Sequence, residues 1–151
     1  MVCLGNICRS PLADGLLRRK VTESKLDVTV DSAGTSAYHE GERPDRRMLE
    51  TSKRRGTPID FLRSRPFSAL DFETFDVIYV MDQSNLQNVL KLAANDAQKA
   101  KVKLILNEVD PDAHDEVPDP YFGGSEGFEH VYDLLDQATD NIIEKIKNNE
   151  L

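Results

Sequence analysis

The chain has 151 residues, of which 39% are hydrophobic, and its formal net charge at pH 7 is -8. This length suits a single domain with a sizeable core over residues 1–151, and the acidic balance excludes nucleic acid and anionic membranes as partners, because a polyanion binder needs clustered Lys and Arg. No apolar run approaches the roughly 20 residues that span a bilayer and no signal peptide begins the chain, so we expect a soluble, cytoplasmic monomer.

Short β-rich runs alternate with longer helical patterns along the chain, which is typical of an α/β fold. The first helix is predicted to begin with Ser10 as its N-cap and to bury an apolar stripe that includes Leu12 and Leu16. Residues 27–32 alternate like a β-strand, and residues 33–35 are expected to end it.

A second helix is predicted from Pro44 to Gly56, because glycine suits the left-handed position just past a helix end. The basic cluster at residues 53–55 is interpreted as the last turn of this helix, where cations suit the helix dipole. Residues 77–81 form a nearly continuous apolar run, which predicts a parallel strand covered on both faces.

The second half of the chain supplies a further strand and two helices. Either Asp82 or Ser84 is expected to cap the helix after residues 77–81. The last strand is predicted over residues 102–106, and the final helix, after a long acidic loop, over residues 125–148.

The start of the first strand is missing from this pattern. A loop that feeds a helix in an α/β fold should follow a buried strand, yet only two residues precede Cys3. We therefore expect an N-terminal segment, outside this numbering, to supply the beginning of that strand.

The stretch after Cys3 has the composition of an anion-binding loop. Cys3 and Arg9 stand in the spacing C-x5-R, and Gly5 and Asn6 between them can adopt a left-handed backbone conformation. No proline interrupts residues 4–10, so every backbone N–H there is available to an anion, and the following helix N-terminus adds positive potential. We expect a tetrahedral oxyanion held by these amides and by the planar guanidinium of Arg9.

Cys3 is the predicted nucleophile, because positive potential at such a loop stabilises the thiolate, the reactive form of cysteine. Ser10 is placed to donate a hydrogen bond to that thiolate. The C-x5-R spacing alone arises easily by chance, so the prediction depends on the loop and helix around it. Cys8 admits two interpretations: a small buried hydrophobe, or a redox partner that captures oxidised Cys3 as a reversible disulfide. With only these two cysteines, we expect neither a disulfide framework nor a zinc site.

A phosphoryl-transfer reaction at this loop also needs an acid for the leaving group. The acidic loop after residues 102–106 offers five candidates: Asp110, Asp112, Asp115, Glu116 and Asp119. Composition alone makes each of them a solvated loop acid and does not rank them. Asp119 is distinguished by its setting, because two prolines stiffen the backbone around it, and Tyr121 and Phe122 could shield a substrate ring from water.

These residues carry a resemblance to a known family. The segments V-C-L-G-N-I-C-R-S-P (residues 2–11), D-S-A-G-T (31–35), F-D-V-I-Y-V-M-D-Q-S-N-L (75–86) and D-P-Y (119–121) resemble the low-molecular-weight protein tyrosine phosphatases. The resemblance implies a three-layer α/β fold with a four-stranded, parallel, twisted sheet flanked by helices and a phosphate-binding loop between the first strand and the first helix. It also implies hydrolysis of phosphotyrosine through a cysteinyl-phosphate intermediate, without a metal or an organic cofactor.

By motif position, the resemblance implies Cys3 as the nucleophile and Arg9 as the phosphate clamp. It implies Asp119 as the acid that protonates the departing phenol and then activates water. Asn6 would fix the shape of the loop, and Ser10 would stabilise the thiolate. The implied phosphate-binding residues are Leu4, Gly5, Asn6, Ile7, Cys8, Arg9 and Ser10.

The implied substrate cleft lies between Tyr38 and Tyr121, with Ile7 and Phe122 beside them. Ile7 agrees with phosphotyrosine-directed members, since phosphoarginine-directed relatives tend to carry threonine there. Where many members carry a histidine, this chain has Leu62, so one hydrogen bond that steadies the loop is expected to be absent or replaced. Expected partners are phosphotyrosine proteins or small aryl phosphates, with inorganic phosphate or sulfate as active-site ligands.

Three alternatives remain open. A phosphoarginine phosphatase and an arsenate reductase share the implied fold, although the reductase passes oxidising equivalents along extra cysteines and only Cys8 is present beyond Cys3. A phosphotyrosine- or sulfate-binding module without turnover would need neither the thiolate nor Asp119. The histidines show no metal-ligand spacing and are expected on the surface: His39, His114 and His130.

Overall fold

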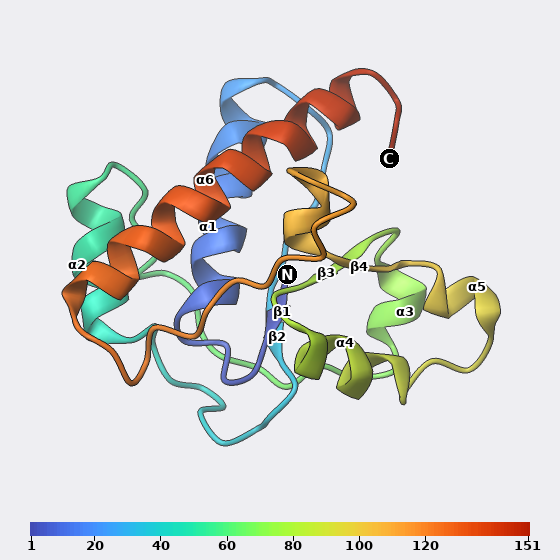
Figure 1. Cartoon of the computed structure of the whole chain (residues 1–151), viewed down its shortest axis with the longest axis horizontal. Coiled ribbons are helices and arrows are strands. Elements are labelled where there is room, and N and C mark those ends of the chain that lie inside the picture. Colours follow the sequence, from blue (N-terminus) through green and yellow to red (C-terminus); the bar gives the residue numbers. More distant parts are fainter.

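The computed structural model describes residues 1–151 and places four parallel strands, in the order β2-β1-β3-β4, between two layers of helices (Figure 1). The strands are β1 (Val2–Cys3), β2 (Ala33–Gly34), β3 (Ile78–Val80) and β4 (Val102–Leu104). The helices are α1 (Arg9–Glu23), α2 (Arg46–Arg54), α3 (Asp71–Thr74), α4 (Gln83–Leu90), α5 (Asp96–Lys99) and α6 (Ser125–Lys147), with a 3₁₀ helix η1 (Ile105–Glu108) after β4. The predicted α/β fold with a four-stranded parallel sheet is confirmed.

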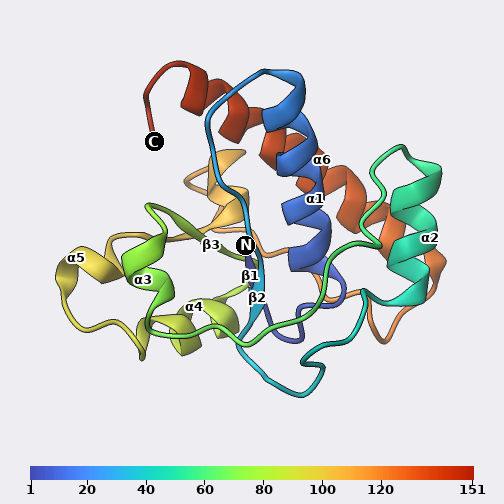
Figure 2. The same ribbon diagram turned by 180° about the vertical axis from the view of Figure 1, so that it is seen from behind.

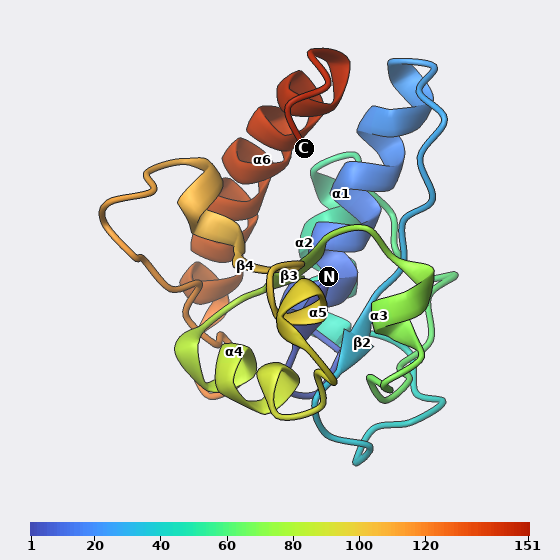
Figure 3. The same ribbon diagram turned by 90° about the vertical axis from the view of Figure 1, so that its right-hand side faces the viewer.

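Each face of the sheet packs against its own group of helices (Figure 3). On one face, Leu16 of α1 and Leu135 of α6 are fully buried in the larger hydrophobic core. On the other face, a smaller core joins Phe72 of α3 and Val89 of α4 to side chains from the strands. None of the helices is both long and apolar enough to cross a membrane.

The short central strand β1 joins the two halves of the sheet. Val2 pairs with Ala33 of β2 on one side and with Val80 of β3 on the other. The prediction of a strand over residues 27–32 is wrong, because these residues run as unpaired extended chain from the end of α1 to β2 (Figure 2). A strand forms only where a neighbour offers backbone partners, and Ala33 is the first residue here whose N–H bonds the chain of β1, donating to the Met1 carbonyl oxygen at 2.9 Å. The backbone hydrogen bonds of β2 therefore form at Ala33–Gly34, within the residues predicted to end the strand.

A hollow of about 680 Å³ lies beside this extended segment. Its apolar lining includes Val28 and Val30 from the segment and Val77 just before β3. At its edge, the amino group of Met1 donates a hydrogen bond to the Asp31 carbonyl oxygen at 3.0 Å. The expected N-terminal segment stays a prediction.

The start of α1 differs from the prediction. The helix begins at Arg9 after Cys8, so Ser10 is not its N-cap. The Ser10 hydroxyl instead lies 3.0 Å from Cys3 Sγ, at the loop that feeds the helix.

The other three predicted helix starts agree better with the structure, and α6 begins at Ser125 as predicted. The predicted second helix is confirmed as α2, which begins after Asp45, carries the basic cluster in and just after its last turn, and is followed by Gly56 at φ 85°. Asp82, rather than Ser84, caps α4 through a reciprocal pair of hydrogen bonds with Asn85. The short helices α3 and α5 were not predicted.

Replacing Gly15 with alanine is expected to destabilise the fold by about 1–3 kcal/mol, the usual cost of overpacking a tight core. Gly15 of α1 lies against the fully buried Ile59, and a Cβ built at Gly15 would lie 2.4 Å from Ile59 Cγ2. Urea denaturation measures the change. Gly127→Ala in α6 is the matched control, because a Cβ there meets Pro120 at an ordinary 3.6 Å. A control that destabilises as much as Gly15→Ala would contradict this packing explanation.

Candidate active site

The loop of residues 4–10 follows β1 and leads into α1 at the carboxyl edge of the sheet, where open parallel sheets bind their ligands. Its outer side is fixed by hydrogen bonds of 2.8 to 3.0 Å to carbonyl oxygens of Cys3 and the loop. Thr35 N–H donates to Cys3, Ser36 N–H to Leu4, the Ser64 hydroxyl to Gly5, and Asp45 N–H to Ile7. Because three segments outside the loop make these four bonds, the loop has a single defined shape.

The backbone N–H groups of residues 4–10 donate to no other group of the protein. Such a run of free donors stands out, because Asn6, Ile7 and Cys8 are buried and buried N–H groups are almost always paired. Successive free N–H groups at a helix N-terminus are the donors that bind an anion. The arrangement is therefore what a cradle for a tetrahedral oxyanion requires.

Asn6 sits in the left-handed region at φ 56° and holds the loop from within. Its Nδ2 donates to the hydroxyls of Ser10 at 2.7 Å and Ser32 at 3.1 Å, and its Oδ1 accepts from the Arg65 N–H at 3.0 Å. Leu62 is buried in the larger hydrophobic core and gives Asn6 no hydrogen bond. Ser32 and Arg65 therefore give Asn6 the hydrogen bonds that steady it, whereas many family members carry a histidine at the position of Leu62.

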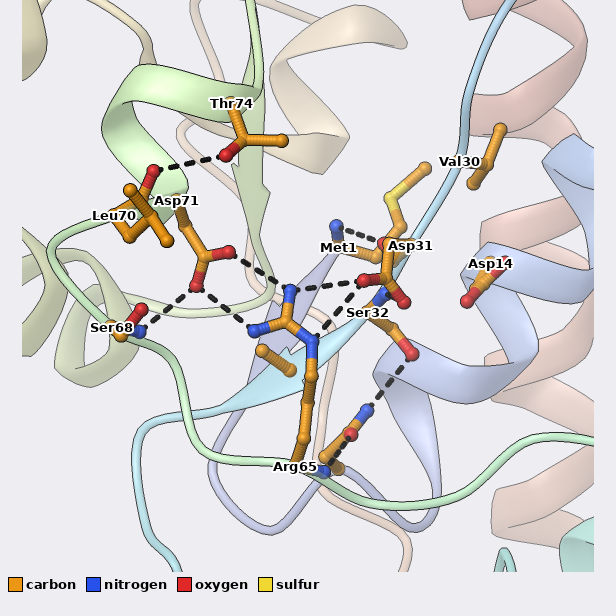
Figure 4. A network of polar contacts seen from close by, with 12 residues as sticks. Met1, Asp14, Val30, Asp31, Ser32, Arg65, Ser68, Leu70, Asp71 and Thr74 are labelled. Atoms are coloured by element: carbon orange, nitrogen blue, oxygen red, sulfur yellow. Dashed lines mark hydrogen bonds and ion pairs between the residues drawn. The ribbon is translucent and has the colours of Figure 1, made fainter.

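Arg65 is itself held in place on both sides of its guanidinium (Figure 4). Nη2 lies 3.1 Å from Asp31 Oδ2 and 3.0 Å from Asp71 Oδ1, and Asp71 also accepts the Ser68 N–H. Because the Arg65 N–H donates to Asn6, this network links the chain just before β2 and the start of α3 to the shape of the loop. The sequence analysis did not single out Arg65.

Cys3 and Cys8 are both free thiols and both buried. Cys3 Sγ lies 3.0 Å from Ser10 Oγ, which is the contact predicted to stabilise a thiolate. Burial, reinforced by Asp45, raises the pKa of the Cys8 thiol. A buried thiol that resists ionisation behaves as a small hydrophobe, so the structure favours the first interpretation of Cys8, and its redox role stays a prediction.

Arg9 projects from the first turn of α1 with only 3% of its side chain exposed. Its Nη1 donates to Asp82 Oδ2 at 2.7 Å and to the Val117 carbonyl oxygen at 3.0 Å. Burial opposes the charged form of Arg9, but the Cys3 sulfur and the carboxylates of Asp82 and Asp119 outweigh it and raise the pKa of this guanidinium. Asp82 thus orients Arg9 as well as capping α4, a role that the sequence analysis missed. Its position at the carboxyl end of the strand next to β1 was the available signal.

The acidic loop brings one of its five candidate acids to Arg9. Asp119 Oδ2 lies 3.6 Å from Arg9 Nη2, and the Asp119 side chain is 34% exposed. The loop is tied to the end of β3 by the Val117 N–H, which donates to the Met81 carbonyl oxygen. Glu116 instead accepts the Gln83 N–H. The remaining candidates lie exposed, with no ion pair to the arginine: Asp110, Asp112 and Asp115.

The aromatic residues predicted to line the cleft lie around one histidine. The His39 ring lies 4.8 Å from the Tyr38 ring and 6.4 Å from the Tyr121 ring, and Phe122 packs edge-on against Tyr121 at 4.9 Å. His39 also closes on the loop, since a Cβ at Gly5 would lie 3.0 Å from its Cδ2. The expectation of surface histidines holds for His114 and His130, which are exposed. His39 is less exposed than these two, with 19% of its side chain accessible, because it packs against Tyr38, Tyr121 and the loop.

Comparisons with known proteins agree with this geometry. The sequence model of the family described as low molecular weight phosphotyrosine protein phosphatase matches residues 1–151. The low molecular weight phosphotyrosine protein phosphatase of Schizosaccharomyces pombe is 42% identical over 148 residues, covering 96% of this chain and 94% of the relative. The crystal structure of a protein tyrosine phosphatase from Entamoeba histolytica, with Hepes in the active site, superposes with a TM-score of 0.92 at 39% identity and covers 99% of this chain and 96% of that one.

A Drosophila arginine phosphatase also shares the fold, with a TM-score of 0.89 at 31% identity over 97% of this chain and 95% of that one. The family match nevertheless spans every residue, and the relatives align over nearly their whole lengths. The chain therefore belongs to the low molecular weight phosphotyrosine protein phosphatase family.

Proposed function

We propose that the protein hydrolyses phosphotyrosine in two steps through a phosphocysteine at Cys3. In the first step, the Cys3 thiolate attacks phosphorus and forms a P–S bond while the P–O bond to the phenol breaks, and Asp119 gives its proton to the departing phenolate. In the second step, Asp119 removes a proton from water, whose oxygen attacks phosphorus and releases the thiolate and inorganic phosphate. Charge and protons balance over the cycle, and no metal or organic cofactor is required.

The observation that carries this proposal is the set of unpaired N–H groups of residues 4–10, the loop that follows Cys3 and includes Arg9. Donors fixed around a phosphoryl group stabilise the charge that its equatorial oxygens carry in the transition state. Arg9 adds a planar, permanently charged fork, which Asp82 orients. We expect inorganic phosphate, the product, and sulfate to bind the same cradle, in line with the sulfonate Hepes in the Entamoeba relative.

The cleft favours an aromatic phosphate ester over the alternatives. Tyr38, Tyr121 and Phe122 offer apolar ring surface for a phenol, and aromatic pairs of this kind contribute about 0.5–1.5 kcal/mol beyond burial. Ile7 is a branched apolar residue where phosphoarginine-directed relatives tend to carry threonine. An arsenate reductase would have to rely on Cys8 as its second cysteine. Burial makes the Cys8 thiol hard to ionise.

The test is turnover by the wild-type protein of matched peptides that carry phosphotyrosine, phosphoserine or phosphoarginine. We expect kcat/KM for phosphotyrosine to exceed each of the others by at least about tenfold, because pocket contacts alone give discrimination of this order. A preference for phosphoarginine would identify an arginine phosphatase instead. Binding without turnover on all three would identify a binding module, and arsenate-dependent oxidation of thioredoxin would identify the reductase.

A further inference from the structure

We propose that Arg47 is a positioning residue for the general acid, because its guanidinium holds the peptide segment that orients the Asp119 carboxylate. The inference deepens the proposed function and rests on the assignment of Asp119 as the acid. Arg47 lies in the first turn of α2, outside both the phosphate loop and the acidic loop.

The contacts run from Arg47 to Asp119 through one residue. Arg47 Nη2 donates to the Tyr121 carbonyl oxygen at 2.8 Å, and Nη1 to the Gly123 carbonyl oxygen at 3.3 Å. The Tyr121 N–H in turn donates to Asp119 Oδ1 at 3.0 Å, which leaves Oδ2 facing Arg9. Fixing Tyr121 therefore fixes the direction in which the Asp119 carboxylate points.

Arg47 is anchored at its other side by the residue that also supports the phosphate loop. Its Nε and Nη2 donate to the two carboxylate oxygens of Asp45 at 3.1 Å each, and the Asp45 N–H donates to the Ile7 carbonyl oxygen at 2.8 Å. Burial disfavours the charged form of Asp45, yet the hydrogen bonds from Arg47 outweigh it and lower the pKa of this carboxyl. The Asp45–Arg47 pair thus contacts both the segment that orients Asp119 and the phosphate loop, so it fixes the position of one relative to the other.

The same guanidinium also supports a wall of the cleft. Its Cζ lies 5.6 Å from the centre of the Tyr121 ring and 4.7 Å from that of Phe128, which is fully buried at the start of α6. A planar fork can serve a carboxylate, two carbonyl oxygens and two ring faces together, whereas the point charge of lysine cannot. The site therefore uses features that only arginine has.

The acidic loop depends on this support because its second half has little other attachment. Its first half is tied to β3 and Arg9 through Val117, but the residues after Asp119 bond the rest of the fold through Arg47. Displacing a catalytic group by about 1 Å costs up to roughly 10²-fold in rate. We expect a smaller loss, about tenfold, because Arg9 still attracts the carboxylate.

The experiment compares Arg47→Gln and Arg47→Lys with the matched control Arg46→Gln, which removes a charge from the adjacent residue, whose side chain is 90% exposed. We expect both Arg47 variants to lower kcat/KM for phenyl phosphate about tenfold, because its poor leaving group needs a well-placed acid in the first step. For dinitrophenyl phosphate, which needs no acid in that step, kcat/KM should stay within about twofold of wild type, and this value also reports that each variant is folded. The control should match wild type on both substrates.

The variants are then combined with Asp119→Asn. If Arg47 acts through Asp119, Arg47→Gln costs nothing further in this background, because the group that it positions has lost its proton. A full tenfold loss in the double variant, or equal losses on both aryl phosphates, would overturn the inference. Failure of the proposed function would look different: Asp119→Asn alone would then leave phenyl phosphate turnover unchanged, or the wild type would show no turnover.

Discussion

Cys3→Ser is expected to lower turnover of phosphotyrosine peptides by about 10⁴-fold or more, which is the scale of loss when an enzyme's nucleophile is removed. A cysteine reacts as its thiolate, and Cys3 leads directly into the loop whose N–H groups are free and which carries Arg9. A serine hydroxyl at this position would need a general base, and the only group recorded in hydrogen-bond contact with Cys3 Sγ is the hydroxyl of Ser10. Steady-state assays at saturating substrate measure the effect.

The control for this substitution is anion binding. Oxygen replaces sulfur without touching the cradle, so Cys3→Ser should still bind inorganic phosphate with a Kd within about tenfold of wild type, measured by isothermal titration calorimetry. Turnover that survives within tenfold of wild type would show that Cys3 is not the nucleophile. Loss of both turnover and phosphate binding would show that the substitution had damaged the loop.

Asp119→Asn is expected to lower kcat/KM for phosphotyrosine and phenyl phosphate by about 10²-fold or more while sparing kcat/KM for dinitrophenyl phosphate, because kcat/KM reports the steps up to release of the phenol and only poor leaving groups need a proton there. The asparagine keeps the size and the acceptor oxygen that bonds the Tyr121 N–H but cannot supply the proton. A plot of log kcat/KM against leaving-group pKa should therefore become steeper in the variant.

Asp112→Asn is the matched control for the acid, because Asp112 is an exposed carboxylate of the same loop with no contact to Arg9. It should leave turnover of both aryl phosphates within about twofold of wild type. A larger effect of Asp112→Asn than of Asp119→Asn would place the acid elsewhere in the loop, and equal loss on both substrates would assign Asp119 a purely structural role.

The parts of the site that lie together in the sequence could be predicted from it. Residues 3–10 contribute the thiol, the amides, the guanidinium and the helix start to one loop. The C-x5-R spacing seen in the sequence therefore marks the same residues whose N–H groups are free in the structure. Even here one local detail was wrong. Ser10 does not cap α1, because its hydroxyl faces Cys3 and Asn6 inside the loop.

The residues that hold this loop come from elsewhere, and no local pattern marks them. Asp82, Arg65 and Arg47 are polar residues whose positions match a helix cap, a connecting segment and a helix surface. Only the fold brings Asp82 within 2.7 Å of Arg9, or the Arg65 N–H within 3.0 Å of Asn6. The low exposure of His39 has the same origin, since Tyr121, which packs against it, lies far along the chain.

The strands show a similar limit. Alternation predicted a strand over residues 27–32 from side chains alone, but a ladder also needs a neighbouring backbone in register. That neighbour is β1, whose two residues meet the chain at Ala33–Gly34. Residues 77–81, in contrast, contain β3 as predicted, because β1 and β4 both lie beside it.

The most direct test of the central claim is to trap the covalent intermediate. Wild-type protein turning over a phosphotyrosine peptide is quenched rapidly into alkaline denaturant, in which a P–S bond persists, and is then digested and analysed by mass spectrometry. We expect one phosphoryl group on the peptide that contains Cys3, and none on that peptide in Cys3→Ser. A phosphoryl group on any other residue, or release of phosphate with no phosphoenzyme at any quench time, would contradict that claim.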